Sequence, residues 1–410
     1  MTSIKQYSSA REKTTGRLLL LAAGTFVVGT GGFVIAGLLP GIALSLRVPE
    51  TSASLLITIY ALVFAIGTPI ISMLTGRVSR TTLMVAGLGL VTVGNILTAV
   101  LPTFELAMVA RVITGIGAAA FVPAATASAA AIAAPGRKGR AISLVTAGFT
   151  AATALGAPIG TAIGALGGWQ TALWFVVALG ALVVVGTGLL LRRIPLPAAQ
   201  TIRERFAPLA NGRIAITLLT TLLIVAGQYS GYTFFGSVQD RATGGSGTVL
   251  ALLLFVYGLF ATIGNLLAGS LADRLGNRVV LNVAVVVLLV DFLAMPLADG
   301  SLWSASILIA VWGLSAWAAL LAVQHRVVEI APGAIAWNSS ATFFGIALSG
   351  PLGGLAISTA GAHNLTLVAA VVVVLALVVG EVSHRLVVRQ ARRAAESPAE
   401  VDGARPLLAA

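Results

Sequence analysis

Arg111 is a cation inside a long apolar run, and its position makes it a candidate for charge chemistry. The run spans residues 104–132, and Arg111 lies roughly 10 Å below one end of it at the 1.5 Å rise per residue of a helix. A guanidinium group removed from water keeps its proton and needs hydrogen-bond acceptors or a water-filled cavity. We therefore predict that Arg111 takes part in charge coupling. The alternative is that its long side chain reaches back to the outer surface of the apolar layer.

Asp291 is the acidic residue near the middle of another apolar run, residues 279–298. Removal from water favours the neutral form of a carboxyl group, which suits proton uptake and release. We predict that Asp291 carries protons; in the alternative it stays neutral and hydrogen-bonds to a neighbouring helix. The sequence has no cysteine, only three scattered histidines and no G-x-x-x-x-G-K-[ST] motif, so it predicts no metal site, no cofactor and no enzyme active site.

Aromatic and amide side chains are concentrated in several of the apolar runs, mostly in the second half of the chain. A cavity with many aromatic rings and few polar groups suits a moderately apolar organic solute. Packing within the protein is the alternative for each single ring. The candidate substrate-binding residues are Phe33, Gln228, Tyr229, Tyr232, Tyr257, Trp312, Asn338 and Phe344.

Small residues recur every four positions in the run 141–165, and Gly156 and Gly160 belong to this stripe. A helix face without side chains lets another backbone approach closely. Pro158 removes a backbone hydrogen bond in the same stretch and favours a kink, and Gly350-Pro351 repeats the combination in the run 335–358. We predict that these residues form a smooth interface on which two halves of the protein move, with static tight packing as the alternative.

The apolar runs themselves identify a membrane protein. Hydrophobic residues make up 58% of the 410 residues and charged residues 9%, whereas soluble domains carry about 25% charged residues. A helix of roughly 20 residues crosses a ~30 Å hydrocarbon layer, and twelve runs reach that length. They cover about 18–42, 52–73, 82–101, 104–132, 141–165, 169–191, 214–236, 247–270, 279–298, 302–325, 335–358 and 365–383. The predicted fold class is an all-α membrane protein with twelve transmembrane helices.

The distribution of positive charge predicts how the chain is oriented. We expect a cytoplasmic tail (1–17), a six-helix bundle (18–191), a cytoplasmic linker (192–213), a second six-helix bundle (214–383) and a cytoplasmic tail (384–410) that is disordered in part. This arrangement places nearly all of the 25 lysines and arginines on one side, as the positive-inside rule requires. The net charge of +12 then reflects orientation in a plasma or inner membrane and predicts no binding of nucleic acid.

A charged turn occurs twice, about half a chain apart. Residues 269–278 connect two apolar runs, and residues 74–83 repeat their leucine, arginine and small residue at constant offsets. This repeat indicates two copies of one membrane unit. We expect the turns to brace one conformation, with Asp273 capping a helix or pairing near Arg274 and Arg278. The candidate gating residues are Arg77, Arg80, Gly156, Pro158, Gly160, Asp273, Arg274, Arg278, Gly350 and Pro351.

The turn at 269–278 resembles the signature loop of the major facilitator superfamily, G-x-L-A-D-R-x-G-x-R-x-x-L. Residues 156–161 and 111–115 resemble its exporter motif and its R-x-x-x-G motif. Residues 29–40 and 323–340 are similar to the drug:proton antiporter-1 family, and within it to sugar-efflux, nucleoside-efflux and chloramphenicol-resistance exporters. The resemblance implies two pseudo-symmetric six-helix bundles, alternating access and proton-driven export.

We accordingly predict a secondary active transporter that exports a small organic molecule (a drug-like compound, a sugar or a nucleoside) in exchange for protons. It would work as a monomer in the lipid bilayer. Gly32 and Gly76 stand where the family commonly has acids, which favours the alternative of a facilitator without proton coupling. A further alternative is a sensor that has the transporter fold.

Overall fold

The fold is known from a computed structural model that describes residues 2–134, 136–191, 194, 206–297 and 300–396. Every regular element in these residues is a helix. Twelve of the helical segments are long and apolar enough to cross a membrane. The predictions of an all-α fold and of twelve spans are therefore confirmed.

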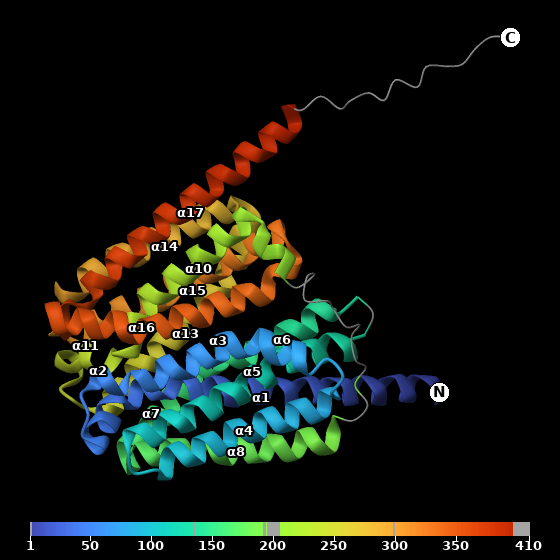
Figure 1. Cartoon of the computed structure of the whole chain (residues 1–410), viewed down its shortest axis with the longest axis horizontal. Coiled ribbons are helices and arrows are strands. Elements are labelled where there is room, and N and C mark those ends of the chain that lie inside the picture. Colours follow the sequence, from blue (N-terminus) through green and yellow to red (C-terminus); the bar gives the residue numbers. More distant parts are fainter. Residues whose placement is uncertain (1, 135, 192–193, 195–205, 298–299, 397–410) are drawn as a thin grey trace.

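The first half of the chain forms one group of packed helices (Figure 1). Its elements are α1 (Thr2–Leu46), α2 (Glu50–Ala53), α3 (Leu55–Leu74), α4 (Arg80–Val100), α5 (Phe104–Ile132), α6 (Lys138–Ala151), the π-helix η1 (Ala152–Gly156), α7 (Ala157–Gly167) and α8 (Trp169–Leu190). Within it α4 packs against α5 and α8, and α5 packs against α3. The α1 helix packs against α6, η1 and α8.

The second half forms a similar group. Its elements are η2 (Ala207–Ala210), α10 (Gly212–Thr233), α11 (Phe235–Val238), α12 (Asp240–Thr243), α13 (Gly247–Leu275), α14 (Asn277–Ala294), η3 (Met295–Leu297), α15 (Leu302–Ile330), η4 (Pro332–Ala334), α16 (Ile335–Ala360), η5 (Ala362–Asn364) and α17 (Leu365–Glu396). Here α13 packs against α15, α10 packs against α16 and α17, and α14 packs against α15 and α17. We call the two groups the first and the second bundle.

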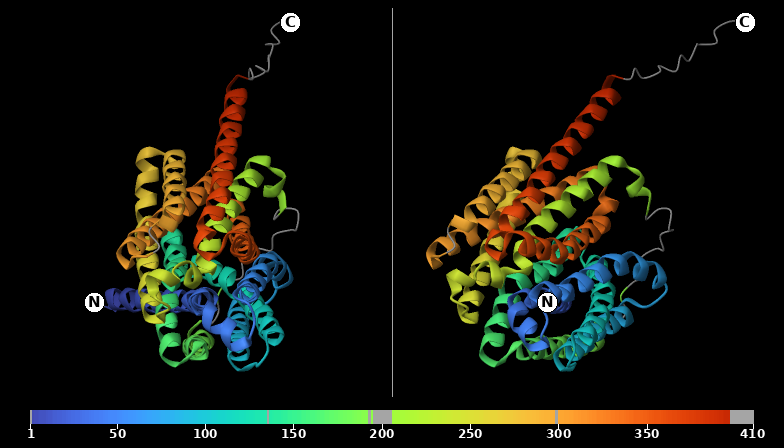
Figure 2. Two further views of the ribbon diagram at one scale, coloured as in Figure 1. Left: turned by 90° about the vertical axis from the view of Figure 1, so that its left-hand side faces the viewer. Right: turned by 60° about the vertical axis from the view of Figure 1, so that its left-hand side comes forward.

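The bundles lie side by side, the first coloured blue to green and the second yellow-green to red in Figure 1 and Figure 2. Four helix pairs carry most of the contact between them: α3 with α16, η1 with α13, α7 with α13, and α1 with α11. Each pair joins a helix of the first bundle to one of the second. A relative movement of the bundles would therefore change the contacts on the surface between them.

Helix ends follow from local sequence. Ser79 caps α4 by accepting a hydrogen bond from the Thr82 N–H at 3.1 Å, and Thr103 caps α5 in the same way at 3.4 Å. The repeated turn at 269–278 is tight because Gly276 alone separates α13 from α14. Its φ of 84° suits glycine, which has no side chain to oppose a left-handed backbone.

The terminal segments are more helical than the sequence suggested. Residues 2–17 continue α1 in the N-terminal direction, and the first part of the expected C-terminal tail continues α17 to Glu396. Most of the predicted linker, residues 192–193 and 195–205, lies outside the described residues, as does the end of the C-terminal tail, residues 397–410.

The fifth span is interrupted where a kink was expected. The α6 helix continues into the π-helix η1, in which the N–H of Ala157 donates to the carbonyl of Ala152 five residues earlier. Pro158 follows at the start of α7 and has no N–H to donate to Ala154. The irregular backbone therefore lies beside a proline, and it faces the second bundle because η1 packs against α13.

Candidate substrate site between the bundles

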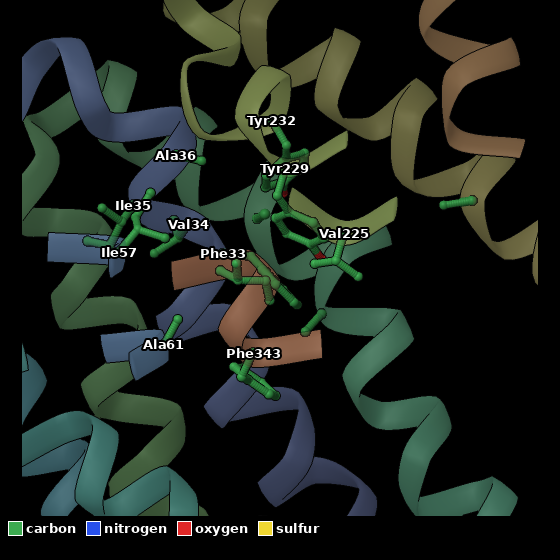
Figure 3. Close-up of a cluster of buried hydrophobic side chains, with 14 of the residues drawn as sticks. Phe33, Val34, Ile35, Ala36, Ile57, Ala61, Val225, Tyr229, Tyr232 and Phe343 are labelled. Atoms are coloured by element: carbon green, nitrogen blue, oxygen red, sulfur yellow. The ribbon is translucent and has the colours of Figure 1, made fainter. Parts of the chain in front are cut away.

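An aromatic cavity lies between the two bundles. Phe33 and Tyr60 line it from α1 and α3, Phe149 lines it from α6, and Tyr232 and Phe343 line it from α10 and α16. Figure 3 shows the rings of Phe33, Tyr229, Tyr232 and Phe343 gathered in one region. The cavity volume is only about 10 Å³, the space needed to hold one water molecule. The centre is thus filled by side chains and leaves no room for an organic solute in this conformation.

Ring contacts join the bundles at this centre. The ring of Phe33 lies 6.1 Å from that of Tyr229 and 6.3 Å from that of Tyr232, measured between centroids. Phe343 meets Phe149 at 6.1 Å. Offset and edge-to-face pairs of this kind contribute about 0.5–1.5 kcal/mol each beyond the area that they bury. The rings therefore both close the centre and hold the bundles together.

A second layer of aromatic residues lies behind the cavity in the second bundle. The centroid of Tyr257 is 5.1 Å from that of Tyr232 and 5.2 Å from that of Trp312. The Tyr257 hydroxyl donates to Gln228 Oε1 at 2.9 Å. Among the described residues, the Nε2 of Gln228, the Nε1 of Trp312 and the hydroxyl of Tyr232 have no hydrogen-bond partner, although all three are buried.

The structure brings some of the predicted substrate residues to the cavity and leaves others apart. Phe33, Tyr229 and Tyr232 line it, and Gln228, Tyr257 and Trp312 belong to the layer behind. Asn338 accepts a hydrogen bond from Thr221 at 2.7 Å within the second bundle. Phe343, and not Phe344, lines the cavity, because adjacent residues of a helix point about 100° apart.

Arg111 is fully buried, with a relative exposure of 0%. Its Nη1 donates to the carbonyl of Gly31 at 3.0 Å and its Nη2 donates to Asn95 Oδ1 at 3.4 Å, while its Nε has no partner among the described residues. The alternative that Arg111 reaches back to the surface is therefore wrong. Gly31 precedes Gly32, which lines the cavity, so Arg111 lies directly behind the cavity wall.

Asp291 is also buried, with 3% exposure, and neither of its carboxyl oxygens has a hydrogen-bond partner among the described residues. The alternative of a carboxyl group bonded to a neighbouring helix is therefore wrong for this conformation. The ring of its neighbour Phe292 packs edge-on against that of Trp312, with the ring centroids 5.3 Å apart. Asp291 is not among the residues that line the cavity.

The charged turn is braced differently from the prediction. Arg278 pairs with Glu381 of α17, with Nη2 at 2.5 Å from one carboxylate oxygen and Nε at 3.2 Å from the other. The exposed Asp273 does not cap α14, whose first turn has no side-chain cap. Asp273 instead lines a surface hollow with Asn277, His325 and Glu329. The expectation that Asp273 pairs near Arg278 is wrong because Glu381, on the adjacent helix, takes that arginine. Arg77 and Arg274 are exposed, and Arg80 begins α4.

The glycine stripe of the fifth span faces α1, inside the first bundle. A Cβ added to Gly156 would lie 2.0 Å from Thr30 Oγ1, and one added to Gly160 would lie 2.4 Å from Val34 Cγ2. The prediction that the stripe forms the surface between the bundles is therefore wrong. The stripe is a close contact of α1 with η1 and α7. The contact with the second bundle uses another face, where a Cβ on Gly258 of α13 would lie 2.3 Å from the Cα of Ala154.

The bundles also touch at the end of the molecule that holds α2 and α11. The Ser237 hydroxyl of α11 donates to the Glu50 carboxylate of α2. A Cβ on Gly350 would lie 2.4 Å from Thr58 Oγ1, and one on Gly354 would lie 3.6 Å from Thr51 Cβ. Pro351 itself is exposed. We call these contacts the α2–α11 closure.

The family model of the Major Facilitator Superfamily matches residues 21–332 and, in a second overlapping match, residues 240–409. The chain belongs to the major facilitator superfamily. Proteins of this superfamily are transport proteins and not enzymes, which confirms the expectation that the chain is not an enzyme. The superfamily membership also identifies the chain as a multi-pass membrane protein that transports a small solute.

Relatives in this superfamily match the chain almost end to end. The uncharacterized MFS-type transporter YbcL of Bacillus subtilis is 28% identical over 368 residues, which cover 89% of this chain and 94% of the relative. The inner membrane transport protein YdhP of Escherichia coli is 30% identical over 373 residues, 90% of this chain and 96% of the relative. Membership of the drug:proton antiporter-1 family stays a prediction.

Solved structures of the superfamily share the fold. A bacterial homolog of the human lysosomal transporter Spinster, in an inward-facing and unoccupied conformation, has a TM-score of 0.70 at 18% identity, over 94% of this chain and 99% of that chain. The nucleoside transporter NupG has a TM-score of 0.69 at 15% identity, over 90% and 99%. At this identity the likeness supports the twelve-helix architecture alone.

Proposed function

We propose that this superfamily member exports a small organic solute by alternating access, with the solute bound at the aromatic cavity between the bundles. The observation that carries the proposal is the composition of the cavity wall, to which both bundles contribute rings. A site built from two halves is completed or dismantled when the halves move. A drug-like compound, a sugar or a nucleoside is the proposed solute, and the aromatic wall would contact its apolar faces once the bundles move apart.

We propose further that both termini are cytoplasmic in the plasma or inner membrane. The positive residues of the N-terminal segment, the linker and the C-terminal segment then lie on the cytoplasmic side. The α2–α11 closure lies at the opposite end of the helices and would close the site from outside. The α2–α11 closure would thus make the cavity accessible from the cytoplasm first, as an exporter requires. One copy of the chain supplies both halves of the cavity wall, so the monomer suffices.

Proton exchange is the proposed driving force. Asp291 is a buried carboxyl group without a hydrogen-bond partner among the described residues, and such a group inside a membrane is a natural place for a transported proton. Arg111 supplies a fixed positive charge behind the cavity. Moving one charge across 100 mV supplies about 2.3 kcal/mol, enough to concentrate a solute tens-fold.

Uncoupled facilitation is the second candidate function, and the packing at Gly32 favours it. The Tyr60 ring fills the space beside Gly32, where an added Cβ would lie 2.9 Å from Tyr60 Cε1. Among the residues that the structure describes, those lining the cavity include no acid, so the wall offers no obvious proton carrier at the solute itself. In this case the solute gradient alone would set the direction of transport.

Transport by the purified protein in liposomes distinguishes these functions. Radiolabelled sugars, nucleosides and amphenicol antibiotics are supplied with and without a pH gradient. Proton-coupled export predicts accumulation that requires the gradient and collapses with an uncoupler. A facilitator would equilibrate the solute without accumulating it, and a sensor would bind the solute without moving it.

A further inference from the structure

In the described part of the chain, the groups that compensate the charge of Arg111 are neutral. Its two hydrogen bonds go to the Gly31 carbonyl and to the Asn95 amide oxygen, and no carboxylate pairs with it among the described residues. A buried cation without a counter-ion is costly in a membrane. An anion that reaches this place would therefore be stabilised by a charge that the protein already holds.

The second aromatic layer also lacks partners for its donors, because it offers hydrogen-bond donors and few free acceptors. The Nε1 of Trp312 and the Nε2 of Gln228 can only donate, and both lack a partner among the described residues. The amide oxygen of Gln228 already accepts from Tyr257. A buried donor left unpaired costs about 1–3 kcal/mol, so a solute that supplies acceptor atoms would recover this cost.

The described residues that line the cavity include no aspartate or glutamate. Aromatic faces can bind a cation, but the fixed charge of Arg111 behind the wall opposes that binding. Only the α1 backbone and the Tyr60 ring lie at this part of the wall, since Gly31 accepts from the guanidinium and the next residue, Gly32, lines the cavity beside Tyr60. An anionic group that displaced the Tyr60 ring from Gly32 would thus lie close to Arg111.

We propose that the central site takes an aromatic carboxylate. The rings of Phe33, Tyr229 and Phe343 would hold the apolar body, Tyr232 and the donors behind it would bind acceptor atoms, and Arg111 would be the counter-ion of the carboxylate. This inference rests on the proposed function, because it names the chemical class of the solute that the same site carries.

Binding of three matched probes tests the inference on the purified full-length protein. 2-Naphthoate, 2-naphthamide and 2-(aminomethyl)naphthalene share one ring system and differ in charge. The carboxylate should bind at least tenfold more tightly than the amide, and the amine should bind more weakly still. Equal or tighter binding of the amide or the amine overturns the inference, and so does the absence of carboxylate binding.

A matched pair of variants identifies the group responsible. Asn95→Asp places a carboxylate next to Arg111 and would compete with the anionic probe, so 2-naphthoate affinity should fall at least tenfold. Asn364→Asp makes the same chemical change at an exposed position and should leave the affinity unchanged. Both variants should unfold in one cooperative transition. Unchanged affinity in folded Asn95→Asp protein removes Arg111 from the site and overturns the inference.

Flux measurements separate this inference from the proposed function. The three probes are offered to liposomes that contain the protein. If the carboxylate binds but no probe is transported, export by this site is contradicted and the anion site stands. If the amine is transported and the carboxylate is not, the anion site is contradicted and the export function stands.

Discussion

The ring of Phe64 on α3 stacks on the ring of Phe343 on α16, with centroids 3.7 Å apart and planes inclined by 17°. The two residues are separated by more than half of the chain and belong to different bundles. Ser340, one helical turn from Phe343, donates to the carbonyl of Ala65 beside Phe64. The stack is therefore part of a continuous contact that joins the bundles next to the cavity.

Phe343→Leu should loosen this contact while keeping an apolar side chain of similar size. Loss of its ring pairs with Phe64 and Phe149 costs about 0.5–1.5 kcal/mol each, and a shift of 1 kcal/mol changes the ratio of closed to open molecules about fivefold. The chain has no cysteine of its own, so Ser340→Cys reports opening through its rate of alkylation by N-ethylmaleimide. The rate should rise severalfold. Phe344→Leu, which changes the adjacent residue outside the cavity wall, is the control; an equal increase with this variant contradicts the assigned role of the stack.

Arg111→Ala should abolish transport while the protein is still produced in the membrane. The substitution removes both hydrogen bonds to Gly31 and Asn95 and the fixed charge behind the cavity. Hydrogen bonds of a charged group contribute about 1.5–3 kcal/mol each, so transport should fall by at least tenfold. Arg111→Lys keeps the charge without the fork of donors and should be intermediate. Full transport by Arg111→Ala would remove this residue from the mechanism.

Asp291→Asn should separate proton coupling from solute movement. The amide has nearly the shape of the carboxyl group but cannot release a proton. If Asp291 carries the proton, accumulation driven by a pH gradient is lost, whereas exchange of solute across the membrane without a gradient continues. Glu105→Gln, at the start of α5, is the control for loss of an acid elsewhere. Gradient-driven accumulation that survives in Asp291→Asn would move the proton site to another group.

Gly258→Ala should disturb the contact of α13 with the π-helix. The added Cβ would lie 2.3 Å from Ala154 Cα and 2.7 Å from the carbonyl oxygen of Thr153. Both are backbone atoms, so a change of side-chain rotamer cannot relieve the clash. The bundles must separate at this point, so transport should slow severalfold or more. Gly89→Ala adds the same methyl group in α4, where a Cβ meets nothing within 4 Å, and should transport normally. Equal rates for the two variants would show that this contact is not needed in the transport cycle.

Much of the fold could be predicted because a membrane imposes simple rules on the sequence. Runs of the right length became the twelve spans, and Gly276 marked the turn between α13 and α14. The π-helix beside Pro158 lies where the sequence predicted an irregular backbone. These features depend on local sequence and on the thickness of the hydrocarbon layer.

The arrangement of the site was less predictable because it depends on which helices meet. The spacing of Gly156 and Gly160 identified a smooth helix face, but only the structure shows that α1 covers it. The choice of Phe344 was off by one residue, which turns the side chain by about 100° around the helix. Phe64 and Phe149 come from the first bundle and carry no local signal that would distinguish them from packing residues.

A disulfide across the α2–α11 closure tests the central claim, that transport requires the bundles to separate. Thr51→Cys with Gly354→Cys places the two Cβ atoms about 3.6 Å apart, within the range of disulfides. Each single variant is the control. We predict that oxidation of the double variant stops transport in liposomes and that dithiothreitol restores it, with little effect on either single variant. Unchanged transport by the fully oxidised double variant would contradict alternating access between these bundles.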